Sequence, residues 1–78
     1  GTMYAMVRLK PGCSIGYHVH EKDSEIFYII KWDASYSDNG ETKIISAGDV
    51  TVCPAGTGHS IANHSGDDVE LIAVIVFA

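Results

Sequence analysis

The sequence is short of the features that mark several large classes of protein. It has only five lysines and arginines against ten acidic residues, a net charge of −5, and no basic run. Nucleic acids and anionic membrane surfaces are therefore poor partners for this chain. No stretch reaches the roughly 18 apolar residues that a membrane-spanning helix needs, so we expect no contact with membranes.

Cysteine is scarce as well, at two residues in the chain. Cys13 and Cys53 are too few for a disulfide scaffold, and we interpret both as free thiols that are small, buried core residues. Free thiols are typical of a reducing compartment, of which the cytoplasm is the simplest. We also see no secretory signal peptide, so we expect a cytoplasmic protein.

Helical periodicity is missing too. No window carries apolar residues at the spacing of a helix face between capping residues. Short β-rich runs are instead separated by Gly, Pro, Asn and Asp, a pattern typical of a sandwich or barrel. We expect eight strands, at residues 3–9, 15–20, 25–31, 34–37, 42–45, 50–53, 59–63 and 69–77. The third of these runs is almost wholly apolar, so we expect both of its faces to be covered.

The length of 78 residues predicts one domain, covering residues 1–78. A chain of this size buries only about 60% of its unfolded surface, so its core is marginal. A bound metal or a second subunit would add useful stability. The composition is 46% hydrophobic and 19% charged, which is ordinary for a globular protein and argues against disorder.

The richest stretch in chemical groups runs from residue 12 to residue 25. His18 and His20 are two residues apart, so on a strand both imidazoles point to the same face. Glu25 can return to that face after a short turn. Two imidazoles and a carboxylate directed at one point form half of a metal site, and His59 is the candidate for a further ligand.

Two spaced motifs resemble those of the cupin family. Gly12, five residues, His18-Val19-His20, four residues and Glu25 resemble the first cupin motif. The second is matched at each of its fixed positions by Gly48, five residues, Pro54-Ala55-Gly56, two residues, His59, three residues and Asn63. The motifs lie in the expected order and span most of residues 12–63.

The resemblance implies an all-β fold, the double-stranded β-helix or jelly-roll barrel of cupins. It implies that His18, His20, Glu25 and His59 bind one divalent transition metal inside the barrel. The ligand set suits Mn, Fe, Ni, Co or Zn and does not choose among them. It also implies that the chain forms a homodimer.

The sequence departs from the family pattern in two ways. The first motif normally ends in a glycine that serves a turn, and Trp32 stands at that position. A bulky residue there costs strain or forces another path, unless Trp32 caps the barrel mouth or an interface. The chain is also shorter than most cupin domains, so it is either a minimal cupin or a fragment that lacks an N-terminal extension.

Strand parity predicts which side chains line the barrel around the ligands. Phe27 and Ile29 are in step with Glu25, and Ile61 is in step with His59. They form either the wall of an apolar cavity for a small organic ligand or plain core packing.

No residue stands out as a general acid or base for a metal enzyme, and the catalytic residues stay unknown. Hydroxyl groups that could serve are each explained as well by packing or by a turn: Tyr17, Tyr28, Tyr36 and Ser60. Lys31 either holds an anionic substrate or is a solvated residue at a strand end. We interpret His64 as a surface residue and Asn63 as a structural amide, and Cys53 is a candidate for a thiol in the pocket.

Three hypotheses on function follow. The first is a metal-dependent enzyme that acts on a small anionic metabolite, as a dioxygenase, decarboxylase or isomerase. The second is a non-catalytic module that binds or senses a small ligand and uses the metal as an anchor. The third is a structural barrel without metal. One ligand set serves all these chemistries, so the fold does not choose among them.

Overall fold

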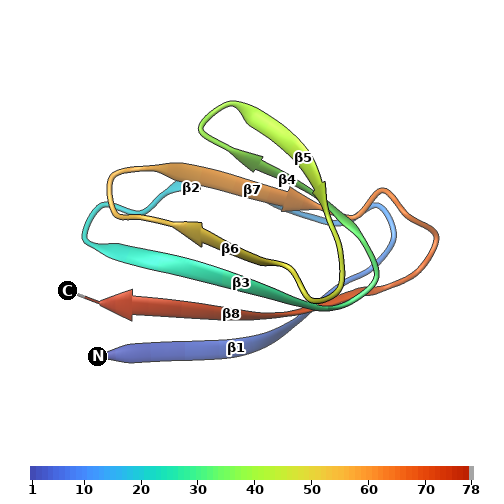
Figure 1. The fold of residues 1–78 in the computed structure, drawn as a ribbon, viewed down its shortest axis with the longest axis horizontal. Coiled ribbons are helices and arrows are strands. Elements are labelled where there is room, and N and C mark those ends of the chain that lie inside the picture. The colour runs from blue at the N-terminus through green and yellow to red at the C-terminus, as the bar shows by residue number, and fades with distance from the viewer. Residues whose placement is uncertain (78) are drawn as a thin grey trace.

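The computed structural model describes residues 1–77, which form eight strands in two four-stranded antiparallel sheets. The first sheet has the order β1-β8-β3-β6 and the second the order β2-β7-β4-β5, and the two face each other (Figure 1). The strands are β1 (Thr2–Leu9), β2 (Ser14–Val19), β3 (Asp23–Lys31), β4 (Ala34–Asp38), β5 (Glu41–Ile45), β6 (Val50–Cys53), β7 (Gly58–Ala62) and β8 (Val69–Phe77). All eight expected strands are present with ends shifted by two residues at most, and the predicted all-β jelly roll is confirmed.

Crossovers between the sheets bring distant parts of the chain together. The chain passes from one sheet to the other at every turn except the one between β4 and β5. As a result β7 pairs with β2, and β8 lies between β1 and β3. The register places His18 opposite His59, although the two residues are 41 positions apart. The two sequence motifs therefore meet at one end of the barrel.

The predicted hairpin between β4 and β5 is formed by Asn39 and Gly40. Both have positive φ angles, 50° and 86°, as a type I′ turn requires. This turn matches the right-handed twist of the flanking strands, and few residues other than Asn and Gly adopt it readily.

Trp32 adopts a backbone conformation that favours glycine. Its φ angle is 72°, in the left-handed region that bulky residues rarely adopt. The residue follows the end of β3, whereas Glu25 lies near the start of that strand. Extended backbone separates the two by roughly 23 Å. Trp32 therefore does not cover the end of the barrel that holds the metal-ligand candidates.

The core fills the space between the inner faces of the two sheets. It comprises Leu9, Phe27, Ile29, Ala34, Tyr36, Ile45, Ile61, Val69, Leu71 and Ala73. The side chains of Phe27, Ile29 and Ile61 are almost completely buried, so of the two readings of these residues core packing is the correct one. Alternation along the strands produces this pattern, since every second side chain points inward.

Two expectations about burial are wrong. The outer face of β3 is not covered in the single chain, where Tyr28 is 44% exposed and Ile30 is 39% exposed. Cys53 is buried as expected, but Cys13 is exposed, because it lies in the turn before β2. A small apolar residue in such a turn has no second layer to pack against.

Residues 1–77 contain no helix that is long and apolar enough to cross a membrane.

Candidate metal centre

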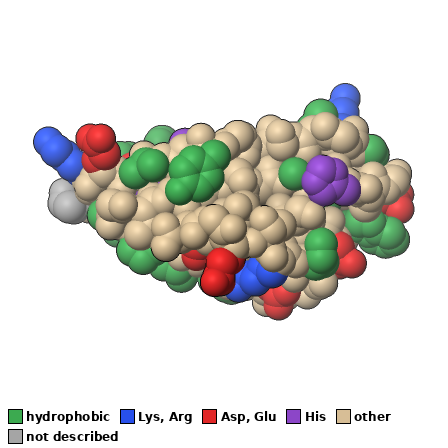
Figure 2. All heavy atoms as spheres, turned by 90° about the horizontal axis from the view of Figure 1, so that it is seen from above, with side chains coloured by type: hydrophobic (Ala, Val, Ile, Leu, Met, Phe, Trp, Pro, Cys, Tyr) green, Lys and Arg blue, Asp and Glu red, His purple; other side chains and the backbone are tan. Residues whose placement is uncertain are grey.

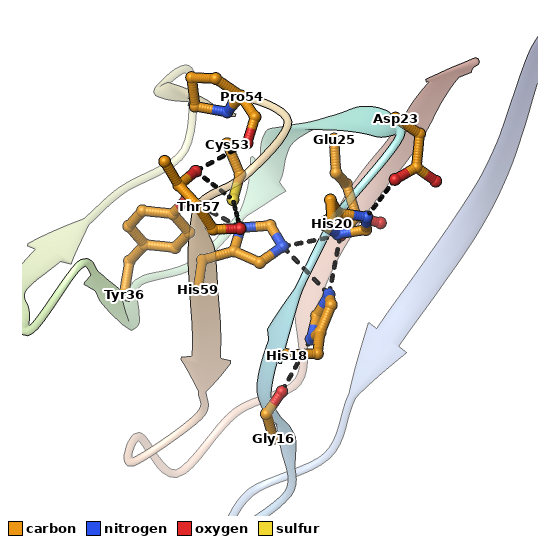
Figure 3. Close-up of polar contacts among 10 residues, drawn as sticks. All are labelled: Gly16, His18, His20, Asp23, Glu25, Tyr36, Cys53, Pro54, Thr57 and His59. Atoms are coloured by element: carbon orange, nitrogen blue, oxygen red, sulfur yellow. Dashed lines mark hydrogen bonds and ion pairs between the residues drawn. The ribbon is translucent and has the colours of Figure 1, made fainter. Parts of the chain in front are cut away.

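Four side chains converge where β2 ends and where β3 and β7 begin (Figure 3). The Nε2 atoms of His18, His20 and His59 lie 3.2, 2.9 and 2.8 Å from Oε1 of Glu25. One donor atom from each of the four residues falls within 4.8 Å of all the others. The structure thus brings together all four predicted residues, as a group able to hold one metal ion.

The far side of each imidazole ring has its own hydrogen-bond partner. Nδ1 of His18 is 2.8 Å from the carbonyl oxygen of Gly16, and Nδ1 of His20 is 3.0 Å from Oδ1 of Asp23. Nδ1 of His59 is 2.9 Å from the hydroxyl of Tyr36. Such partners orient the ring and select its tautomer, as they do around metal-bound histidines.

The donor and acceptor chemistry of the group points to a cation. A carbonyl or carboxylate oxygen only accepts, so His18 and His20 carry a proton on Nδ1. In their neutral forms both rings then direct an unprotonated Nε2 toward the Glu25 carboxylate. Lone pairs facing a carboxylate repel one another unless a cation lies between them. The donor set of three imidazoles and one carboxylate fits a divalent transition metal.

The protonation of the group depends on whether a cation is present. Burial raises the pKa of the Glu25 carboxyl, but without a cation, hydrogen bonds from imidazoles that carry a proton on Nε2 outweigh burial and hold that pKa below its usual value of 4.5. Burial lowers the pKa of His59 below its usual value of 6.5, although the nearby Glu25 carboxylate opposes the shift. Near neutral pH the centre therefore combines an ionised Glu25 with a neutral His59, the forms in which they bind metals.

The cluster is open to solvent on one side only. The side chain of His18 is 36% exposed, whereas those of His20, Glu25 and His59 are at most 10% exposed. Glu25 also borders a cavity of about 280 Å³ between the sheets, with walls that include Val7, Ile15 and Ile75. A small ligand can therefore reach the centre from the β1 and β2 side.

Sequence reasoning missed the residues that line this cavity. The inner side chains of β1, at Met3, Ala5 and Val7, form much of the wall. Their alternation was visible in the sequence, but only the pairing of β1 with β8 shows that this face points inward. Asp23 was also missed, because a carboxylate in a polar turn gives no sign that it will contact His20.

Of the candidate acid and base residues, only Tyr36 lies at the centre, through its hydrogen bond to His59. Tyr17 and Tyr28 are largely exposed, and Lys31 is solvated beside Glu70. The Cys53 thiol contacts Thr57.

Asn63 and His64 have the places expected of them. The buried amide of Asn63 donates to the carbonyl oxygens of Leu9 and Asp67 and accepts from Ser65, which ties two loops together. His64 is exposed.

The fold and the cluster define a small double-stranded β-helix with a group of three histidines and one glutamate. The cupin domain profile matches residues 5–75, and the chain belongs to the cupin family. An oxalate-binding protein of Thermotoga maritima is 42% identical over 74 residues, which cover 95% of this chain. These residues are 61% of that protein, so the chain spans less than two thirds of the length of this relative.

Solved structures show the same similarity. A predicted oxalate decarboxylase from Thermotoga maritima superposes with a TM-score of 0.95 at 41% identity, over 97% of this chain and 66% of the other. A cupin 2 conserved barrel domain protein from Salinispora arenicola gives 0.90 at 27% identity, over 99% and 64% of the two chains.

Proposed function

We propose that His18, His20, Glu25 and His59 bind one divalent transition metal and that this metal anchors a small dicarboxylate of the oxalate class. The observation that carries the proposal is the convergence of three Nε2 atoms on one Glu25 oxygen, with their Nδ1 atoms held from behind. The oxalate-binding relative supports the choice of ligand. The ion is Mn, Fe, Ni, Co or Zn.

The bound metal supplies positive charge and a Lewis acid to which a carboxylate group can bind. An ion that accepts six ligands would keep room for a bidentate dianion beside the four protein ligands. The wall of the cavity is mostly apolar, with Val7, Ile15 and Ile75 among its side chains, and this suits a small organic ligand. His18 and His20 donate hydrogen bonds to Gly16 and Asp23, and His59 shares one with Tyr36, so the three imidazoles are held in place.

Binding without turnover is the function that the geometry favours. Among the described residues that line the cavity, Glu25 is the only carboxyl group, and it belongs to the ligand set. Tyr36 is the best candidate for a proton donor, but its hydroxyl is already hydrogen-bonded to His59. An enzyme that transforms the same anion is the second candidate, since a structurally similar protein is a predicted oxalate decarboxylase.

We propose that residues 1–78 act as one domain, that the chain is a cytoplasmic homodimer, and that it uses neither nucleic acid nor membrane as a partner. The acidic net charge of −5 and the absence of a basic run support the last point.

The test combines metal analysis with calorimetry. We expect near one equivalent of metal in the native protein, and binding of oxalate but not of acetate to the metal-loaded form. His59→Ala should lose the metal and the oxalate binding while staying folded, and His64→Ala is the matched control at an exposed histidine. Full metal occupancy in His59→Ala would overturn the ligand assignment.

Formation of formate and CO₂ from oxalate separates the two candidates. Release of both products by the metal-loaded protein, absent in His59→Ala, would replace the binding module by the enzyme. Tight oxalate binding without products would support the module.

A further inference from the structure

A β-bulge lies in β2 directly before the metal-ligand candidates. Ile15 and His18 both pair with residues of β7, and two residues, Gly16 and Tyr17, separate them on β2. Only Ser60 separates their partners on β7. Two residues of one strand therefore oppose a single residue of the other, which is the arrangement of a bulge.

The pairing of the two strands is intact on both sides of the bulge. Before it, the backbone N–H of Asn63 donates to the carbonyl oxygen of Cys13 at 2.9 Å. After it, the N–H of His20 donates to the carbonyl oxygen of Thr57 at 3.2 Å. The extra residue is thus held between two ordered stretches of different register, so it shifts every side chain that follows it.

The bulge decides which side chains of β2 face the barrel. The side chain of Ile15 packs against the core, so alternation along a straight strand would also turn Tyr17 and Val19 inward. The extra residue reverses the alternation: His18 and His20 point at the metal centre, and Val19 is 54% exposed. Burial of apolar surface alone favours the straight strand, because that strand would bury two apolar side chains in place of two imidazoles. Another contact must therefore hold the bulge.

The ring of Tyr17 lies on Gly58 at the outer side of the second sheet. A Cβ atom added to Gly58 would overlap Oη and Cζ of Tyr17 and would lie 2.6 Å from Cε1. The ring thus fills the space in which any other residue has a side chain, and Gly58 is buried beneath it. Figure 2 shows this side of the molecule, where hydrophobic side chains lie apart from one another. Packing of the ring therefore depends on the glycine rather than on an apolar cluster.

We propose that Tyr17 and Gly58 are a positioning pair for the metal centre. The ring packed on the glycine holds Tyr17 outside, which fixes the bulge, and the bulge turns His18 and His20 toward Glu25. β2 depends on such a contact because, among residues 1–77, it is an edge strand that pairs with β7 alone. This inference rests on the metal site of the proposed function and adds two residues that do not belong to the ligand group.

The test removes the contact from either side. Gly58→Ala displaces the ring without straining the backbone, because Gly58 does not have a positive φ angle. Tyr17→Ser removes the ring, whereas the conservative variant Tyr17→Phe keeps the ring atoms that lie on Gly58. Gly66→Ala is the matched control, since a Cβ atom added there meets nothing within 4 Å and Gly66 also lacks a positive φ. Chelator competition measures metal affinity at a temperature where every variant is folded.

We expect metal affinity to fall about tenfold in Gly58→Ala and in Tyr17→Ser, as it does when other groups that orient metal ligands are removed. Tyr17→Phe and Gly66→Ala should keep the affinity of the wild type. In the double variant the two losses should not add, because Gly58→Ala then meets no ring. Additive losses, or an unchanged affinity in Gly58→Ala, would overturn the positioning role.

Histidine modification tests the same idea in the metal-free protein. Diethyl pyrocarbonate reacts with accessible imidazoles, and His20 is only 8% exposed. Its modification should be slow in the wild type and faster in Gly58→Ala and Tyr17→Ser, with the exposed His64 as the reference in each sample. A wild type that binds no metal would overturn the proposed metal site, and this labelling would still decide the inference. Equal labelling of His20 in all these proteins would overturn the positioning pair.

Nuclear magnetic resonance of the unmodified chain keeps the inference falsifiable if a variant fails to fold. Nuclear Overhauser contacts should join the ring protons of Tyr17 to the Hα protons of Gly58. Their absence would show that the ring does not lie on the glycine and would overturn the proposal.

Discussion

Three hydrogen bonds behind the metal-ligand candidates give the centre its order. Gly16, Asp23 and Tyr36 each contact Nδ1 of one imidazole and leave its Nε2 directed at Glu25. The ring of His59 is also stacked on Phe27, with ring centroids 4.7 Å apart and an angle of 8° between the planes. Packing and hydrogen bonding thus fix the same His59 ring, which loses little conformational freedom when it binds a metal.

The first prediction concerns Tyr36. Tyr36→Phe removes the hydroxyl behind His59 but keeps the aromatic ring that packs in the core. We expect metal affinity to fall about tenfold, the lower end of the usual range, because stacking on Phe27 still holds His59. Competition with a chelator measures the change.

Tyr17→Phe is the matched control, since it removes a phenolic hydroxyl from the outer side of β2. An unchanged affinity in Tyr36→Phe, or an equal loss in Tyr17→Phe, would contradict a role for this hydrogen bond.

The second prediction concerns the pH dependence of the metal-free protein. Burial holds the pKa of His59 in the folded chain below 6.5, the usual value, which applies to the unfolded chain. Between the folded pKa and the unfolded pKa, the unfolded chain therefore binds more protons than the folded one. Stability is then complete above about pH 6.5 and falls as the pH drops through the folded pKa of His59. The pKa of Glu25 is also lowered, so a further loss follows below pH 4.5.

Thermal unfolding between pH 8 and pH 4 measures this dependence. His59→Gln should flatten the slope just below pH 6.5, whereas His64→Gln at an exposed position should leave it unchanged. A slope in His59→Gln equal to that of the wild type would show that another group causes it.

Among the structural elements, the turn after β3 combines a bulky residue with a backbone conformation that favours glycine. The first cupin motif has glycine at this position, whereas here Trp32 has a left-handed conformation with φ at 72°. The indole is 46% exposed, so it gains limited burial in return. We expect the strain to be stored locally at the end of the barrel away from the metal centre.

The third prediction isolates this strain by comparing two substitutions that both remove the indole. Trp32→Gly should be more stable than Trp32→Ala by about 1 kcal/mol, because only glycine adopts a positive φ without steric cost. Urea unfolding of the two metal-free variants gives the difference. Equal stabilities, or a more stable alanine variant, would show that the turn does not carry the strain.

For the whole molecule, the metal centre joins three strands of a small barrel. The ligand candidates come from different sheets: Glu25 lies on β3 of the first sheet, and His18 and His59 lie on β2 and β7 of the second. One ion bound to them would therefore connect the two layers. A chain of 78 residues has a marginal core, and such a connection matters more here than in a large domain.

The fourth prediction follows from this linkage. A metal at about 100 times its Kd should stabilise the folded chain by about 2.7 kcal/mol, provided that it does not bind the unfolded chain. For a domain of this size that raises the Tm by roughly 10–20 °C. Calorimetry with and without metal measures the shift, and Glu25→Gln should abolish most of it. A metal-independent Tm in the wild type would exclude tight binding to the folded state.

Much of the fold was predictable because it depends on local chemistry. Gly, Pro, Asn and Asp separate the strands, and the Asn39-Gly40 turn has the backbone that its residues favour. The four metal-ligand candidates were also predictable, because His18 and His20 share a face by alternation and the cupin motifs add Glu25 and His59.

Contacts between distant residues depend on the register and on the packing of the sheets, which local patterns do not specify. The pairing of β1 with β8 decides that Met3 and Val7 face the cavity, and only the fold brings Asp23 and Tyr36 behind the imidazoles. The exposure of Cys13 and of Tyr28 was missed for the same reason, since apolar character does not say whether another layer covers a residue.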